Sequence, residues 1–128
     1  MSGGTCEVSS HNGGGFPGVH SELQKNIGHV PVFFRSLADS DPAMHDAVLR
    51  LDNYIWADGN LTRKQKKLIA IAIAAALRDD HAVHAQIQGA KNLGVTLAEI
   101  DEALRVAFML AGMPAYVYGK SAADAAYK

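Results

Sequence analysis

The sequence predicts an all-α fold, and four observations carry this prediction. Thr62 with Gln65 forms a capping box, a pattern that begins a helix. Thr96 with Glu99 forms a second capping box. Eighteen alanines lie from position 57 onward, and alanine has the highest helix propensity. No segment alternates apolar and polar residues between turn signals, as a half-buried strand would.

The first residues are expected to contribute little to this fold. Residues 1–18 hold six of the twelve glycines and a single charge, so we expect a flexible tail, which contains Cys6. We expect a short helix near residues 19–27 that ends at Gly28, and a second short helix after Pro31.

The remaining helices follow from local start and stop signals. Asp41 can cap a helix that has Pro42 at its first position and ends at Gly59. Its buried residues, at helical spacing, are expected to be Met44, Val48, Leu51 and Ile55. Further helices are expected over residues 63–78, 80–93 and 97–111, and from Pro114 toward Tyr127 with an interruption at Gly119. We therefore expect residues 19–128 to form one helical domain.

The apolar run over residues 68–77 predicts an oligomer. Its ten apolar residues are about half of what a membrane span needs, so it reads as a helix buried on all sides. A chain of 128 residues cannot easily cover such a helix, and a subunit interface would supply the missing cover. We expect a homo-oligomer, with complete covering inside one subunit as the alternative. Because no targeting signal is visible, we expect a cytoplasmic protein.

Charge and cysteine content exclude several classes of protein. The net charge of -1 and the pI of about 6.6 give no reason to bind nucleic acid or an anionic membrane. The single cysteine excludes an intrachain disulfide framework, a zinc site with paired cysteines and a redox cysteine pair within one chain.

A cluster of cations begins the helix predicted over residues 63–78. Arg63, Lys64, Lys66 and Lys67 occupy its first turn, where free backbone N–H groups can also bind an anion. A carboxylate-bearing ligand would suit this turn, and a solvated surface turn is the alternative. Lys67 directly precedes the apolar run and is the cation most expected to face a pocket.

Two histidines form the second candidate site. His81 and His84 share one helix face, and Asp80 lies four residues before His84, where it could orient the imidazole. Acid–base catalysis, metal binding and a purely structural or solvent-exposed role all stay open. Tyr116 and Tyr118 follow a helix break and could line a cleft.

Several short segments between positions 61 and 118 stand in a characteristic order and spacing. They are residues 61–62, 68–74, 89–90, 94–96, 99–104 and 111–115. In this arrangement they resemble the carboxymuconolactone decarboxylase family, which includes the alkylhydroperoxidase D-like proteins. The resemblance implies a compact all-α bundle of the alkylhydroperoxidase D-like type that assembles as a trimer or hexamer.

The resemblance also separates two branches of the family. The peroxidase-like branch has a glutamate, a Cys-x-x-Cys motif and a histidine at positions that here hold Lys67, Asp79, Ala82 and Gln86. Without a thiolate, peroxide reduction has no nucleophile, and Cys6 has no resolving partner. The decarboxylase branch is more similar, because it lacks the cysteines and has a histidine at His81. Its second histidine falls at Gln86, with His84 between the two positions.

These observations together predict a cofactor-independent lyase or decarboxylase that acts on a small carboxylated lactone or organic acid between subunits. The predicted catalytic residues are Lys67, which would stabilise developing negative charge, and His81 and His84, one of which would move a proton. The predicted substrate-binding residues are Arg63, Lys64, Gln86 and Tyr116; no metal or cofactor is expected. Two alternatives stay open, a non-catalytic protein that binds a small anion or a protein partner, and a peroxiredoxin-like antioxidant protein.

Overall fold

A computed structural model of the chain describes residues 32–128. The predicted tail with Cys6 and the helix predicted near residues 19–27 lie outside the described residues. Within them the structure contains helices and no strand, which confirms the predicted fold class. The chain divides into two compact units, residues 1–57 and residues 58–128. The expectation that residues 19–128 form one domain stays a prediction.

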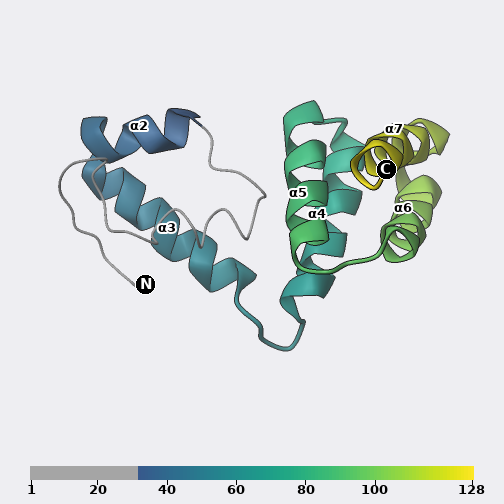
Figure 1. Cartoon of the computed structure of the whole chain (residues 1–128), viewed down its shortest axis with the longest axis horizontal. Coiled ribbons are helices and arrows are strands. Elements are labelled where there is room, and N and C mark those ends of the chain that lie inside the picture. Colours follow the sequence, from purple (N-terminus) through teal and green to yellow (C-terminus); the bar gives the residue numbers. More distant parts are fainter. Residues whose placement is uncertain (1–31) are drawn as a thin grey trace. The chain divides into compact units, whose positions relative to one another are not determined.

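The described part of the first unit is a pair of helices, α2 (Val32–Ser40) and α3 (Pro42–Trp56), which pack against each other (Figure 1). As predicted, Asp41 caps α3, because its side chain accepts a hydrogen bond from the Met44 N–H at 3.2 Å. Phe34 and Leu49 form the buried apolar contact of this pair.

The predicted buried face of α3 is right only for Val48, which is half-buried and packs against Phe34 and Leu49. Met44, Leu51 and Ile55 are each about half exposed, whereas His45 and Leu49 are buried. The reason is that α2 covers a different side of α3, where the ring of Phe34 stacks on the His45 imidazole with centroids 4.6 Å apart. Helical spacing identifies an apolar stripe, but it does not say which stripe the neighbouring helix covers.

The second unit contains four helices, labelled in Figure 1: α4 (Arg63–Leu77), α5 (Asp80–Asn92), α6 (Leu97–Ala111) and α7 (Met113–Ala126). Both predicted capping boxes are present at the starts of α4 and α6. Arg78 ends α4 with a left-handed backbone, φ 54°. Helices α4 and α7 each contact the other three helices of this unit, and α4 has extensive contacts with both α5 and α6.

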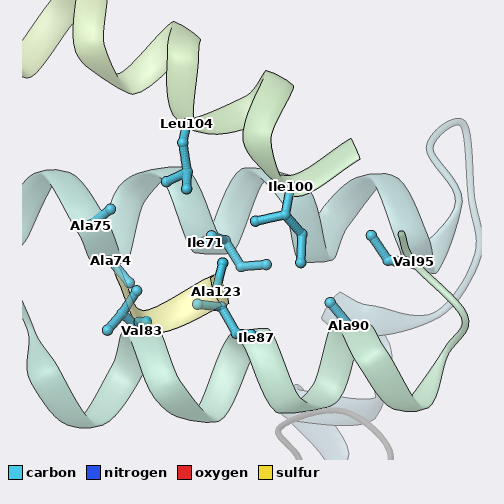
Figure 2. Packing of buried hydrophobic residues seen from close by; sticks show 11 residues of the cluster. Ile71, Ala74, Ala75, Val83, Ile87, Ala90, Val95, Ile100, Leu104 and Ala123 are labelled. Atoms are coloured by element: carbon cyan, nitrogen blue, oxygen red, sulfur yellow. The ribbon is translucent and has the colours of Figure 1, made fainter. Parts of the chain in front are cut away.

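The core of the second unit is built mainly from small and β-branched side chains (Figure 2). Ile71 of α4 lies opposite Ile100 and Leu104 of α6, while Val83 and Ile87 come from α5. The alanines of this core allow helix backbones to approach closely. They are Ala74, Ala75, Ala90, Ala122 and Ala123.

Helix α7 runs without interruption through Gly119, contrary to the sequence prediction. A Cβ atom built at Gly119 would lie 2.5 Å from Leu104 Cδ2 and 3.0 Å from Ala75 Cβ. Gly119 is therefore a point where α7 lies close to α4 and α6. Packing at this contact offsets the low helix propensity of glycine.

One side of α4 is not covered by the other helices of the second unit. Ile69, Ile73 and Leu77 are 47%, 55% and 73% exposed, although the sequence predicts a helix buried on all sides. These three residues recur every four positions and form an apolar stripe opposite the buried side that carries Lys67 and Ile71. No helix among residues 32–128 is long and apolar enough to cross a membrane.

The close packing at Gly119 predicts that a larger side chain there destabilises the fold. Gly119→Ala should lower the free energy of unfolding by about 1–2 kcal/mol, because overpacking outweighs the gain in helix propensity. Urea unfolding would measure the change, and Gly59→Ala, with nothing within 4 Å of its Cβ position, is the control. In a Leu104→Ala background the cost should shrink, and a Gly119→Ala protein as stable as the original would contradict this account.

Candidate functional site

A buried charged residue on α4 is the centre of the candidate site. Lys67 is fully buried, although ammonium groups are almost never buried unless they are paired. Its Nζ donates a hydrogen bond of 2.7 Å to Oε1 of Gln86 on α5. The structure thus brings together one predicted catalytic residue and one predicted substrate-binding residue that lie 19 positions apart.

The cationic turn of α4 differs from the predicted anion site in one respect. Two of its backbone N–H groups already have acceptors within the chain, since Arg63 N–H donates to Asp58 Oδ1 at 2.6 Å and Gln65 N–H donates to Thr62 Oγ1 at 3.1 Å. Any anion at this turn would therefore depend mainly on the side-chain cations. Arg63 is half-buried and Lys64 is exposed.

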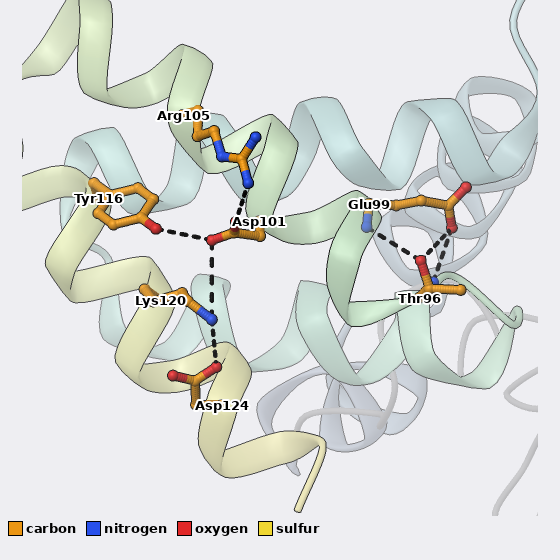
Figure 3. Close-up of polar contacts among 7 residues, drawn as sticks. All are labelled: Thr96, Glu99, Asp101, Arg105, Tyr116, Lys120 and Asp124. Carbon is orange, nitrogen blue, oxygen red and sulfur yellow. Dashed lines mark hydrogen bonds and ion pairs between the residues drawn. The ribbon is translucent and has the colours of Figure 1, made fainter.

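Lys64 faces the start of α6. Hydrogen bonds from the Thr96 backbone and side chain hold the pKa of the Glu99 carboxyl below its usual value, and the nearby Lys64 ammonium lowers it further. The charge of Lys64 therefore acts on the capping box of α6, which Figure 3 shows between Thr96 and Glu99.

The two predicted catalytic histidines lie on the surface of the chain. His81 and His84 are both exposed on α5. His84 Nδ1 lies 2.8 Å from the backbone oxygen of Asp80 and 3.5 Å from its Oδ1, as the predicted i, i+4 pairing implies. Because a carbonyl oxygen only accepts, this contact requires a proton on Nδ1, so Nε2 of the neutral ring is the acceptor.

The histidines and Gln86 lie on different sides of α5. An α-helix turns by about 100° per residue, so His81 and His84 are about 140° and 160° round the helix from Gln86. Within one chain the structure does not bring either imidazole to the side where Gln86 meets Lys67. Their catalytic roles stay predictions, and they would have to act at a site that a second subunit completes.

Tyr116 joins α7 to α6 (Figure 3). Its hydroxyl donates to Asp101 Oδ1 at 2.9 Å, and Arg105 pairs with Asp101 Oδ2 at 2.9 Å. Lys120 lies 3.9 Å from Asp101 Oδ1 and 2.7 Å from Asp124. The hydrogen bond raises the pKa of Tyr116 and, more than the charge of Arg105, lowers the pKa of Asp101. Tyr116 therefore has a structural partner in addition to its predicted role in substrate binding.

Sequence reasoning missed two contacts that the fold creates, one polar and one aromatic. Tyr118 donates to Asp80 Oδ1 at 3.0 Å, which joins α7 to the start of α5 across 38 positions. His45 is buried against Phe34. Neither contact has a local signal, because each depends on helix packing. Across residues 32–128, no three His, Cys, Asp or Glu side chains are grouped so that they could hold a metal ion.

Comparisons with known proteins agree with this fold. The model of the carboxymuconolactone decarboxylase family matches residues 42–125. The uncharacterized protein MJ0742 of Methanocaldococcus jannaschii is 38% identical over 76 residues, which are 59% of this chain and 73% of that protein. The uncharacterized protein 4 in the cox locus of Paracoccus denitrificans is 32% identical over 80 residues, 62% of this chain and 72% of that protein.

A solved structure shows the same fold. It is the crystal structure of a protein from Burkholderia xenovorans LB400 that is provisionally named carboxymuconolactone decarboxylase. The TM-score is 0.71 at 21% sequence identity, over 84% of this chain and 87% of the other. At this identity the similarity concerns the fold alone.

The hydrogen bond between Tyr116 and Asp101 is predicted to stabilise the fold in a pH-dependent way. The pKa of Asp101 is lower in the folded protein than in the unfolded chain. The ionised carboxylate therefore stabilises the fold at pH values above its unfolded-state pKa, and this stabilisation is lost as the pH falls through its folded-state pKa. Tyr116→Phe should therefore lower the midpoint of urea unfolding at pH 7, and the difference from the original protein should narrow at low pH. Tyr54→Phe, at an exposed position, is the control. A deficit that is constant across pH would contradict this explanation.

Proposed function

The chain belongs to the carboxymuconolactone decarboxylase family, and we propose that it is a cofactor-independent lyase of this family. Its substrate would be a small carboxylated lactone or a related organic acid. The observation that carries the proposal is the fully buried Lys67, whose ammonium is held by Gln86 at 2.7 Å. Loss of carbon dioxide leaves negative charge on the substrate, and a fixed cation in a water-poor site stabilises such charge strongly.

The other predicted residues take supporting roles in this proposal. Arg63 and Lys64 extend the positive charge at the start of α4, and Tyr116 would contact the bound substrate. One of the exposed imidazoles, His81 or His84, would move the proton. Because both lie on the far side of α5 from Gln86, they would act on a substrate held by Lys67 of a different subunit.

Assembly is therefore part of the proposal. The exposed stripe of Ile69, Ile73 and Leu77 is the apolar surface that a second copy of the chain would cover, in a trimer or hexamer. We further propose that the protein is cytoplasmic and that it binds neither nucleic acid nor membranes.

A non-catalytic anion-binding protein is the second candidate, and one observation favours it. Lys67 has no exposed surface in the single chain, so a ligand reaches its ammonium only if neighbouring side chains move. A protein that binds an anion there without turnover would retain the charge and lack the proton-transfer group. Asp79 and Ala82 at the cysteine positions give the antioxidant alternative no comparable support.

Replacement of Lys67 tests the lyase proposal. Lys67→Met keeps a long side chain and removes the charge, so it should lower the turnover of a carboxymuconolactone by about a hundredfold or more. Lys128→Met, at an exposed position, is the matched control and should keep full activity. Anion binding without turnover in the original protein would favour the second candidate, and an active Lys67→Met enzyme would refute the mechanism.

Subunit mixing tests the shared site. A double variant, His81→Ala with His84→Ala, should be as inactive as Lys67→Met. Mixed oligomers of the two inactive proteins should regain part of the activity, because some sites then receive an intact lysine from one copy and intact histidines from another. Mass spectrometry would establish that the oligomers are mixed. If mixed oligomers show no recovery of activity, Lys67 and the histidines do not form one site shared between subunits.

The exposed stripe predicts the effect of a charge at the interface. Ile73→Lys combined with Leu77→Lys should shift the protein toward monomers in light-scattering measurements, because a lysine at a buried interface loses its hydration. Glu102→Lys, on the exposed surface of α6, should leave the assembly unchanged. An unchanged oligomer in the double variant would exclude this stripe as the interface.

A further inference from the structure

The Lys67–Gln86 hydrogen bond determines how the Gln86 amide is oriented. An ammonium group has three donors and no acceptor, so the atom of Gln86 that faces it must be the amide oxygen. The structure has this arrangement, with Oε1 at 2.7 Å from Nζ. The ambiguity between O and N that usually affects a glutamine side chain is thus resolved by the chemistry of its partner.

The orientation of the amide leaves its donors for another group. Nε2 is the other branch of the same amide, so its two N–H groups point away from Lys67. Gln86 is half-buried, and Nε2 donates to no residue in the described part of the chain. A ligand that approaches from the side of Gln86 therefore meets N–H groups, with the Lys67 charge behind them.

The pair also cannot exchange a proton through Gln86, because an amide does not titrate in the range where enzymes work. The resemblance to the peroxidase-like branch implies a glutamate and a histidine at these two positions, and both of those can take up protons. Lys67 and Gln86 present a charge and donors instead. In this chain the two positions are joined by a hydrogen bond between α4 and α5.

We propose that Gln86 is a specificity-determining residue that, together with Lys67, recognises an oxygen carrying negative charge, such as a carboxylate or enolate oxygen. The Nε2 group donates to this oxygen, and the Lys67 ammonium supplies the charge that favours an anion over a neutral carbonyl. This inference rests on the proposed function, because it takes Lys67 to be the cation that holds the substrate.

Acetate and acetamide test the proposal, since they have similar shapes and differ in charge. We expect acetate to shift the side-chain NH₂ signals of Gln86 in ¹⁵N-edited NMR titrations of the full chain, and acetamide to shift them at least tenfold more weakly. Failure of acetate to shift these signals, or equal affinity for both probes, would overturn the inference.

Two variants of Gln86 separate donation from simple competition for Lys67. Gln86→Met removes the donors, and we expect about tenfold weaker acetate binding; if Gln86 merely competes with the ligand, the affinity would stay equal or rise. Gln86→Glu replaces the donors by a second acceptor and a negative charge, so acetate binding should be lost. Acetate binding to Gln86→Glu at the original affinity would also overturn the inference. Thermal melts of each variant establish that the fold is retained.

Lys67→Met distinguishes failure of this inference from failure of the proposed function. If Lys67→Met abolishes acetate binding and Gln86→Met leaves it unchanged, the role of Lys67 stands and that of Gln86 falls. If Lys67→Met binds acetate at the original affinity, the proposed function itself falls. Weaker binding in both variants supports both statements.

Discussion

The close packing of α4 against three other helices is the constraint on which the second unit depends. Such packing requires small side chains where the backbones meet, and Ala74, Ala75 and Gly119 supply them. Larger residues then fill the remaining space, with Ile71 and Leu104 at the centre (Figure 2). Because the helices approach so closely, polar groups on their facing sides are removed from water and must find partners across the contact.

Lys67 shows the consequence of this constraint for function. It stands on the packed side of α4, one turn before Ile71, where an apolar residue would serve stability better. The Gln86 amide satisfies one of its donors from α5, so the charge is held at a defined place between two helices. A charge in this position is costly for folding and valuable for binding an anion, which is the reason that the proposed function centres on it.

The polar contacts between α6 and α7 have a different character. Asp101 is linked to Tyr116, Arg105 and Lys120, so positive and negative groups alternate through the cluster (Figure 3). These groups fasten α6 to α7 on a partly exposed part of the surface, whereas the hydrogen bond between Lys67 and Gln86 joins α4 to α5 at a buried ammonium. Family membership therefore identifies the scaffold, while the chemistry depends on which partner each charged residue meets.

The sequence by itself determined the all-helical class and most helix ends, because caps such as Thr62 and Thr96 act on the backbone within their own first turn. It also singled out Lys67, from its place beside the apolar run. Only the tertiary structure decided that α7 passes through Gly119, that α3 buries His45 rather than Met44, and that Lys67 of α4 meets Gln86 of α5. These features depend on which neighbour covers each helix side, and a local pattern of residues carries no information about a neighbour distant in the chain.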